Sequence, residues 1–357
     1  MDTSELRRQD YTLDGDQVVL RDLFAQFFAR ECPMDVVRAA EPTGHDPQLW
    51  RATAELGAMS MALPAEAGGD GAGIVEVALL AEQLGRRIAP VPLVEHVVAS
   101  RLLAAGGGDD PIATLLADAS RGRTVLGLGL ERYDVPQLVS SGAVAGAVVG
   151  HRAGAVVVST GGPQPHAANQ AGLPSAWRDL GAEPCVEVPV ASTAVLVDRA
   201  RRELKVLTAA ALVGLTEGAL ALAVSFVQTR RTQGVPLGSL QGVSFPLADV
   251  AIGVAGARHL CRRAAWFLDH EPEAEPDLPG IAFAYAAEVA THGVTVALHA
   301  HGGLGFAVES DVSRYFLRAK GWTLAAGDPG RDVLAAGEAL LAKAARPDRE
   351  DRRWTSR

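Results

Sequence analysis

A few residues of this sequence have a type and spacing that would suit chemistry, although none of them indicates a site alone. Arg230 lies in the run TRRTQG, and its planar guanidinium suits phosphate oxygens, although an arginine at a helix end is often only a surface residue. The pair Gly302–Gly303 can end a helix and let a ligand approach the backbone, but such pairs are also common C-caps. The run LGLGL at 126–130 has no GxGxxG or Walker pattern, so we interpret it as a strand rather than a phosphate loop.

The composition excludes several other kinds of site. Cys32, Cys185 and Cys261 lie far apart, with no CxxC pattern, which predicts buried thiols, no disulfide framework and no metal site. The net charge is −9 and no cluster of Lys and Arg forms a stripe, which argues against nucleic acid as a partner. No uninterrupted run of about 18 apolar residues occurs and the N-terminus is polar, so we expect no membrane segment and a cytoplasmic protein.

The elements that must position these residues begin with a helical layer. Apolar residues recur at helical spacing over 16–30 and 74–87, and the dipeptide Asp46–Pro47 predicts the start of a short helix that ends at Gly57. The run AAGGGDDP at 104–111 indicates a loop near the end of this layer. Residues 1–118 are therefore predicted to form an N-terminal helical domain.

The pattern then changes to short runs rich in β-branched residues. The runs TVLGLGL, GAVAGAVVG, GAVVVST and TAVLVD predict strands of a small middle β domain, which we place at residues 119–202. Helical periodicity returns over 204–231, 246–270, 281–301 and 331–345, with an acidic, proline-rich loop at 271–280. These lengths predict a four-helix bundle over residues 203–345, followed by a polar tail at 346–357.

Three stretches of the chain resemble motifs of the acyl-CoA dehydrogenase superfamily, whose domains follow the same order. The stretches are ELGAMSMALPAEAGGDGAGIVEVALLAEQLGRRIAPVP at 55–92, TRRTQGVPLGSLQGVSFPLADV at 229–250 and LHAHGGLGFAVESDVSRYFLRAK at 298–320. The resemblance implies an α+β, mainly α fold. It also implies a flavin adenine dinucleotide (FAD) enzyme that removes a proton beside a thioester carbonyl while the neighbouring carbon gives hydride to the flavin.

The resemblance assigns cofactor contacts to residues of the second and third stretches. Arg230 matches an arginine that meets the flavin diphosphate, often that of a neighbouring subunit, and Thr232 and Gln241 match hydrogen-bonding positions. His299 stands where a glutamine is usual, and the pair Gly302–Gly303 matches the glycines against which the dinucleotide packs. Gln233, where an aromatic residue is common, weakens one apolar contact.

The usual catalytic glutamate of the family has no counterpart here. Its position falls on Ala326, and Asp328 nearby is better explained as an N-cap or turn residue. Some branches of the family place the base on the first bundle helix, and that position falls on Leu204. Glu203 beside it is a candidate base, but one residue of rotation on a helix is about 100°. The other interpretation of Glu203 is a solvated surface charge.

The middle domain also departs from the family. The segment that contacts flavin and thioester in the family should lie near 126–136, where this chain has LGLGLERYDVP without the expected hydroxyl donors.

Three functions remain open at this point. The first is the base-lacking subunit of a two-gene acyl-CoA dehydrogenase, as known for bulky, steroid-like thioesters, which binds flavin across an interface while its partner supplies the glutamate. The second is a self-sufficient homo-oligomer in which Glu203 or an unaligned residue is the base. The third is a non-redox or structural member of the fold that has lost the flavin. For the enzyme, the implied partners are an acyl-CoA or other acyl thioester, a like or homologous subunit, and a possible electron-transfer protein.

Overall fold

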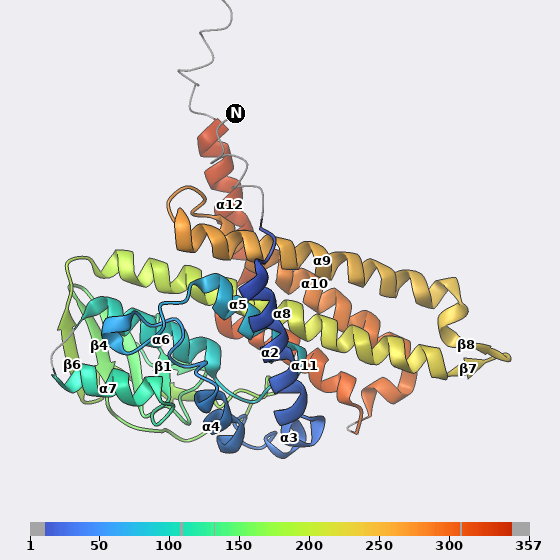
Figure 1. Cartoon of the computed structure of the whole chain (residues 1–357), viewed down its shortest axis with the longest axis horizontal. Helices are drawn as coiled ribbons and strands as arrows, with labels where there is room; N and C mark the ends of the chain where they lie inside the picture. Colours follow the sequence, from blue (N-terminus) through green and yellow to red (C-terminus); the bar gives the residue numbers. More distant parts are fainter. Residues whose placement is uncertain (1–10, 108–109, 132, 308, 345–357) are drawn as a thin grey trace, which may run out of the picture.

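The computed structural model describes residues 11–107, 110–131, 133–307 and 309–344. The predicted polar tail at 346–357 lies outside these residues. Helices dominate the fold, and a small β domain lies at one end of a long helical bundle (Figure 1).

The N-terminal part is a helical layer, as predicted. Helix α2 begins with a capping box in which the Asp14 carboxylate accepts a hydrogen bond of 2.8 Å from the Gln17 backbone N–H. Asp46 caps the next predicted helix, which has Pro47 at its first position. The elements of this layer are α2 (Gly15–Glu31), α3 (Met34–Ala39), α4 (Pro47–Glu55), η1 (Ala65–Ala67), α5 (Ile74–Arg86), α6 (Leu93–Gly106) and α7 (Asp110–Ser120).

The middle domain contains a four-stranded sheet in the order β1-β3-β4-β6 and a two-stranded ribbon of β2 and β5. Strand β1 pairs with β3 in parallel, whereas the other pairs are antiparallel. The strands are β1 (Leu126–Leu128), β2 (Gln137–Val139), β3 (Ala147–Arg152), β4 (Ala155–Ser159), β5 (Ala176–Arg178) and β6 (Cys185–Pro189).

The first bundle helix begins earlier than predicted. The run TAVLVD at 193–198 is not a strand: it forms the first turns of α8 (Thr193–Thr229), whose N-cap is Ser192. The prediction was wrong because periodicity cannot distinguish a strand from a helix in so short an apolar run with β-branched residues. The run is helical because it forms the start of the long, packed helix α8.

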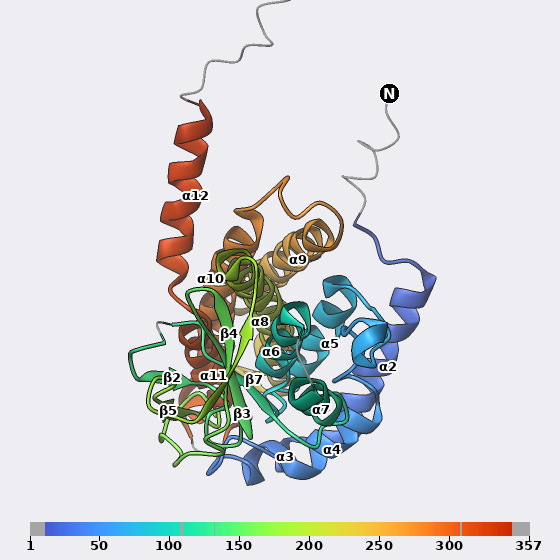
Figure 2. The same cartoon turned by 90° about the vertical axis from the view of Figure 1, so that its left-hand side faces the viewer.

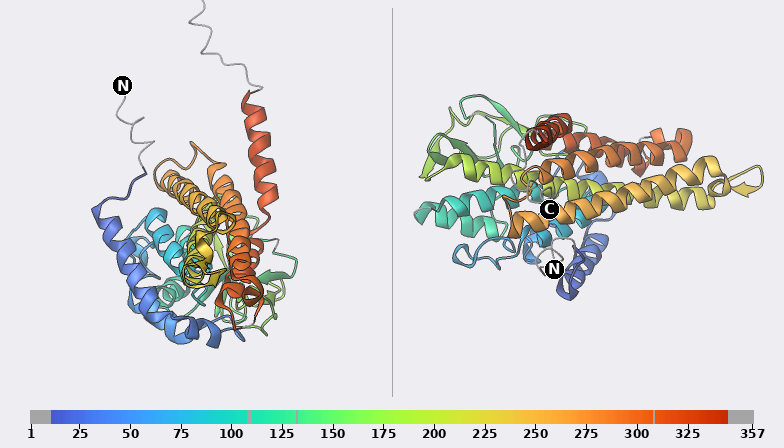
Figure 3. Two further views of the ribbon diagram at one scale, coloured as in Figure 1. Left: turned by 90° about the vertical axis from the view of Figure 1, so that its right-hand side faces the viewer. Right: turned by 90° about the horizontal axis from the view of Figure 1, so that it is seen from above.

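The bundle consists of α8, α9 (Gln241–His270), α10 (Leu278–His301) and α11 (Asp311–Ala326). A hairpin of β7 (Arg231–Thr232) and β8 (Val235–Pro236), followed by η2 (Leu237–Ser239), connects α8 to α9, and η3 (Gly302–Phe306) follows α10. The four helices run side by side along the long axis of the molecule (Figure 3).

The helix predicted over 331–345 forms as α12 (Pro329–Ala344), but its predicted place in the bundle was wrong. The fourth bundle helix is α11, which packs against α8 and α10, whereas α12 projects away from the body (Figure 2). Apolar side chains on α12 remain exposed, among them Leu334 and Leu341. Periodicity alone cannot tell which apolar face finds a partner within its own chain.

Glycines allow α5 and α8 to cross at very short range. A Cβ atom on Gly214 of α8 would lie 1.8 Å from the carbonyl oxygen of Glu82, and a Cβ atom on Gly85 would lie 1.9 Å from that of Ala211. This contact joins the N-terminal layer to the bundle, and residues of both elements belong to one continuous hydrophobic core.

Two helical stretches, Thr193–Thr229 and Leu278–Phe306, are long and apolar enough to cross a membrane by length and composition. Of their most apolar windows, 61% and 56% are buried inside the molecule, so core packing accounts for their composition. The prediction of three buried thiols was wrong for one of them, because Cys32 and Cys261 are buried but Cys185 on β6 is exposed.

Candidate functional site

A cavity of about 880 Å³ lies where the N-terminal layer, the β domain and the bundle meet. Its wall is largely apolar and comes from α6, the strands β1 and β2, the segment 169–175, one face of α8, and the end of α11 with the start of α12. A cavity of this size at a domain junction is typical of a small-molecule site.

The two residues that the sequence resemblance matches to the family's base positions both line this cavity. Ala326 at the end of α11 and Leu204 on α8 each line the wall. Neither side chain can accept a proton.

Glu203 faces a different direction. It is absent from the cavity wall to which its neighbours Leu204 and Lys205 contribute, and it is only 2% exposed. Arg101 donates hydrogen bonds of 3.0 and 2.9 Å to its two carboxylate oxygens, and Arg199 donates another of 2.9 Å. Its interpretation as a solvated charge was therefore wrong, because the carboxylate is buried in an ion-pair cluster.

The acidic residues after α11 have structural partners. Asp328 lines the cavity and accepts a hydrogen bond of 2.9 Å from the backbone N–H of Gly330, so it caps the turn into α12 as predicted. Asp332 also lines the cavity and forms a short ion pair with Lys205 of α8. The two contacts hold the start of α12 in place as part of the cavity wall.

The sequence did not reveal Glu95 as a cavity residue. Glu95 lies in the first turn of α6 and lines the cavity, and among the described residues no side chain bonds or pairs with its carboxyl. Burial raises the pKa of this carboxyl, and the Glu95 backbone N–H opposes the rise in part. Its one sequence signal is an acid inside the largely apolar run VPLVEHVV, and a single acid in such a run does not indicate a site.

A second polar residue of the wall is Gln137 on β2. It is 6% exposed, and its Oε1 accepts a hydrogen bond of 3.2 Å from the backbone N–H of Glu131. Its Nε2 is buried without a hydrogen-bond partner among the described residues. The segment 126–136 itself contributes Leu128, Leu130 and Glu131 to the wall.

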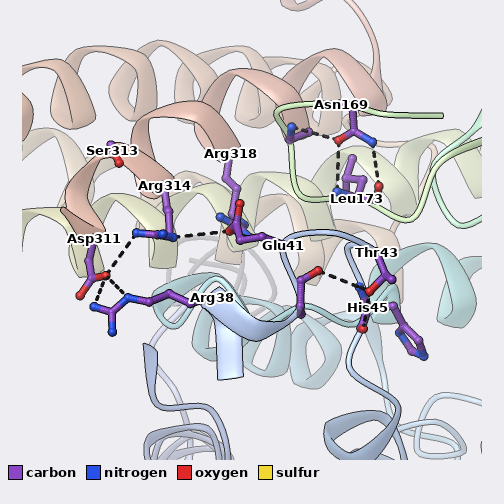
Figure 4. Close-up of polar contacts among 12 residues, drawn as sticks. Arg38, Glu41, Thr43, His45, Asn169, Leu173, Asp311, Ser313, Arg314 and Arg318 are labelled. Atoms are coloured by element: carbon purple, nitrogen blue, oxygen red, sulfur yellow. Dashed lines mark hydrogen bonds and ion pairs between the residues drawn. The ribbon is translucent and has the colours of Figure 1, made fainter. Parts of the chain in front are cut away.

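The segment 169–175, which is part of the cavity wall, lies beside the polar contacts of α11 (Figure 4). Arg318 of α11 donates a 2.7 Å hydrogen bond to Glu41, and Trp322 Nε1 donates one of 3.2 Å to the carbonyl of Ala171. Gly172 has a positive φ of 61°, and a Cβ atom there would lie 2.5 Å from the Arg318 guanidinium. The Asn169 Nδ2 closes the turn with a 2.8 Å hydrogen bond to the Leu173 carbonyl.

The predicted flavin residues gather elsewhere, at the end of the bundle that carries the β7–β8 hairpin (Figure 1). Arg230 is the C-cap residue of α8, Thr232 lies on β7, and Gln241 is the first residue of α9. The end of α10 lies beside them, because His301 stacks on Phe226 of α8 with ring centroids 4.5 Å apart. The structure therefore brings the six residues to one region: Arg230, Thr232, Gln241, His299, Gly302 and Gly303.

This region is open to solvent. Arg230, Gln241 and His299 are exposed, and a Cβ atom on Gly302 or Gly303 would meet nothing within 4 Å. The hairpin turn is formed by Gln233 and Gly234, which both have positive φ, and this backbone fits a type I′ turn. The arrangement presents a guanidinium, an amide, an imidazole and uncovered backbone to a ligand or partner.

The cavity and this bundle end are separate places on α8. Ala211 is the last residue of α8 in the cavity wall, and Arg230 follows it by about 28 Å of helix rise at 1.5 Å per residue. A ligand in the cavity therefore does not touch the bundle end of the same chain unless it is very long.

A second cavity, of about 800 Å³, lies on the other side of α8, beside α6 and α9. Its wall is polar and includes Arg101 and Arg199, the two partners of Glu203. Asp269 also lines it and caps α5 by accepting hydrogen bonds of 2.8 and 3.0 Å from the backbone N–H groups of Ile74 and Val75. Among the described residues no group of His, Cys, Asp and Glu could hold a metal ion.

Comparison with known proteins identifies the family. Residues 14–123 match the model of the acyl-CoA dehydrogenase N-terminal domain, and residues 200–340 match that of the acyl-CoA dehydrogenase C-terminal domain. Together these ranges take in well over half of the chain, and the unmatched stretch between them is the β domain.

Relatives extend the match over most of the chain. The acyl-CoA dehydrogenase IpdE2 of Mycolicibacterium smegmatis is 27% identical, with 89% of this chain and 96% of that protein covered. The acyl-CoA dehydrogenase FadE27 of Mycobacterium tuberculosis is 29% identical, with 83% and 88% covered. In the solved ChsE4–ChsE5 complex from Mycobacterium tuberculosis, one chain matches with a TM-score of 0.82 at 25% identity, with 93% of this chain and 99% of that chain covered. The chain belongs to the acyl-CoA dehydrogenase family.

Proposed function

We propose that this protein is the base-lacking subunit of a two-component, FAD-dependent acyl-CoA dehydrogenase. In this assembly the exposed bundle end contributes part of a flavin site that is completed by a homologous partner subunit. The partner supplies the catalytic glutamate, and the assembly removes two hydrogens from the α and β carbons of an acyl thioester. The proposal places the protein in the cytoplasm, with an electron-transfer protein as the class of acceptor.

One observation carries this proposal. Ala326 and Leu204 line the same cavity, so both places that could hold the family's base are present and both are apolar. Neither of the two positions matched to the family's base carries an acid here. Glu203, the acid beside Leu204, does not replace it, because its carboxylate is bound by Arg101 and Arg199 outside the cavity wall. Asp328, two residues after Ala326, caps the turn into α12.

The bundle end fits the diphosphate half of FAD in its donor chemistry. Arg230 has no hydrogen bond or ion pair from its guanidinium among the described residues, and it lies beside two glycines whose backbone is open to approach. Thr232, Gln241 and His299 would add hydrogen bonds there. Bound FAD would supply the hydride acceptor of the reaction, which no side chain can replace.

The distance between the two places supports a shared flavin site. Arg230 lies about 28 Å beyond the cavity along α8, so a flavin bound at the bundle end belongs to the cavity of another subunit. Two similar structures favour unlike subunits: one is the ChsE4–ChsE5 complex from Mycobacterium tuberculosis, and the other is the Tcur3481–Tcur3483 steroid acyl-CoA dehydrogenase. A further structure of this fold, that of PigA, contains FAD.

Arg230→Ala, with Arg231→Ala as matched control, tests the shared site. Arg231 is the adjacent exposed arginine, and its Nη1 donates a 3.1 Å hydrogen bond to the carbonyl of Gly234 within the hairpin. Each variant is co-purified with a homologue whose gene lies nearby and whose sequence keeps the glutamate. We expect Arg230→Ala to lower the flavin content of the complex at least fivefold and Arg231→Ala to change it little. Equal flavin content in both variants would contradict the proposal.

The alternative of a structural protein without flavin has its own support in Gln233 and in the altered β domain. It predicts that the complex, or the chain alone, is colourless at every stage of purification.

A further inference from the structure

The polar cavity beside α6 and α9 has no part in the proposed function. Its volume is about 800 Å³, and none of the residues matched to the family's base or flavin contacts lines it. Three arginines contribute to its wall, Arg101, Arg199 and Arg262. They differ in whether the protein pairs their charge.

Two of these arginines are paired and the third is not. Arg101 and Arg199 share the carboxylate of Glu203. Arg262 of α9 has no hydrogen bond and no ion pair among the residues that the structure describes, and its Nε is buried without a partner. Buried N–H groups in proteins are nearly always hydrogen-bonded, so this exception requires an explanation.

The surroundings of Arg262 do not supply a counter-charge. Burial lowers the pKa of Arg262, and the acid that opposes this shift most strongly is Glu82. Glu82 accepts a 2.9 Å hydrogen bond from the Nε of Arg258, so its carboxylate already has a cation. Within the described part of the chain, Arg262 is therefore a cation without an anion of its own.

The acids of the cavity limit the charge that a ligand can carry. Asp14, Glu76 and Asp269 line the wall, and each accepts hydrogen bonds from backbone N–H groups at the start of α2 or α5. These carboxylates offset the positive ends of the two helix dipoles. A ligand with one negative charge can pair with Arg262, whereas a second negative charge would be repelled by the three carboxylates.

The wall beside Arg262 is aromatic. Trp266 and His270 follow Arg262 by one and two turns on the same face of α9, and both line the cavity. Their rings stack with centroids 4.7 Å apart, and Tyr11 meets Trp266 edge-on at 5.9 Å. Trp266 is only half-buried, so a flat ring in the cavity can pack against it.

We infer that the polar cavity binds a planar aromatic monocarboxylate, with the carboxylate paired to Arg262 and the ring packed on Trp266. The planar guanidinium suits a carboxylate because its N–H donors form a fork that matches the two oxygens. The volume of about 800 Å³ lies within the usual range of small-molecule sites. The inference rests on this cavity alone, so it does not depend on the shared flavin site.

A pair of probes that differ in charge tests the inference. 2-Naphthoate carries a carboxylate, and 2-naphthamide has the same ring with a neutral amide in its place. Binding of each is measured at neutral pH by calorimetric titration on the full chain, in complex with its partner if the chain alone is not stable. Binding at the apolar cavity or to the partner is common to all variants and cancels in the comparison.

Four proteins decide the outcome: wild type, Arg262→Met, Arg263→Met and Trp266→Leu. Arg263 is the neighbouring arginine of α9, but it pairs with Glu275 and does not line the cavity, so Arg263→Met controls for the loss of a charge from this helix. We expect naphthoate to bind wild type and Arg263→Met at least about tenfold more tightly than naphthamide, which is the effect of one charge-assisted hydrogen bond. In Arg262→Met this preference disappears while naphthamide binds as before, which also shows that the variant is folded. In Trp266→Leu both probes bind about fivefold less tightly and the preference remains.

Three results would overturn the inference. The first is equal binding of the two probes to wild type, because the cavity would then not select an anion. The second is a preference that survives in Arg262→Met or that Arg263→Met removes as well. The third is binding of 2-naphthyl phosphate that is tighter than that of naphthoate and is lost in Arg262→Met, because the site would then accept a second negative charge. None of these results depends on whether flavin is shared between subunits.

Discussion

Arg101 of α6 holds both carboxylate oxygens of Glu203 of α8, at 3.0 and 2.9 Å, on the side of α8 opposite the apolar cavity. The pair is almost fully buried, with the Arg101 side chain 13% and the Glu203 side chain 3% exposed. Glu203 is therefore a structural acid that joins the N-terminal layer to the bundle.

Glu203→Gln should lower stability without removing a catalytic group. The substitution leaves the buried Arg101 without its counter-charge, which costs about 3 kcal/mol. We expect this loss in the free energy of unfolding from urea titration, and unchanged turnover per folded complex. In the double variant Arg101→Met with Glu203→Leu, much of the stability should return, since both charges of the buried pair are removed together. Turnover lowered a hundredfold or more in a folded Glu203→Gln complex would show instead that Glu203 is the base.

His96 should make the protein sensitive to mild acid. The ring is fully buried beside Trp50, and its Nδ1 accepts a 3.0 Å hydrogen bond from the backbone N–H of Leu126. Burial lowers the pKa of His96 to about 4. The unfolded chain, with an ordinary histidine pKa of about 6.5, therefore binds the proton more readily, so stability is complete above about pH 6.5 and falls as the pH drops towards 4.

The size of this effect is about 3 kcal/mol, from a pKa difference of about 2.5 at 1.36 kcal/mol per unit. Thermal unfolding between pH 4.5 and 7.5 should show a shallower pH dependence for His96→Asn, whose amide oxygen can accept from Leu126 but does not titrate. Identical slopes for wild type and variant would mean that other groups cause the acid sensitivity.

The three thiols should differ sharply in reactivity. Cys185 is exposed on β6, whereas burial raises the pKa of Cys32 to about 12 and that of Cys261 further still. Because the thiolate is the reactive form, we expect one rapid equivalent of reaction with Ellman's reagent in the native protein and three after denaturation. Cys185→Ser should remove the rapid equivalent. Rapid reaction of two thiols in the native protein would contradict the packing around Cys32 or Cys261.

Gly214→Ala should disrupt the crossing of α5 and α8. The added methyl group would lie 1.8 Å from the Glu82 carbonyl oxygen, so the helices must separate along a core contact, with a cost of about 3 kcal/mol or more. Gly337→Ala is the matched control, because the same change inside α12 meets nothing within 4 Å and should stabilise that helix by up to about 1 kcal/mol. Similar urea midpoints for the two variants would contradict the described crossing.

The helices and strands that were predicted correctly are those with strong local sequence signals. Asp46–Pro47 indicated a helix start by its own chemistry, and the short runs of β-branched residues in β3 and β4 indicated buried strands. The segment 193–198 was missed because six apolar and β-branched residues do not distinguish a strand from the first turns of a long helix. The places of α11 and α12 depend on which faces pack together, and this is a tertiary property.

The candidate site was likewise predictable only where local motifs exist. Motifs pointed to the bundle-end residues such as Arg230, whose role as a flavin contact stays a prediction. They also pointed to Ala326, which the structure places in the cavity wall. Motifs could not reveal Glu95 or Gln137. These residues are far apart in sequence, and they line one cavity only because the fold brings α6 and β2 to the same wall. Nor could motifs show that Glu203 is buried, since this depends on Arg101 about a hundred residues away.

The absorbance spectrum of the purified protein between about 350 and 500 nm tests the central claim most directly, because a flavin shared with a partner defines the proposed function. The spectrum is recorded for the chain alone and for the chain co-expressed with the neighbouring homologue that keeps the glutamate. The account predicts flavin absorbance and acyl-CoA oxidation only in the co-expressed complex. A yellow, active chain alone would contradict the shared site, and no colour in either sample would contradict the redox function.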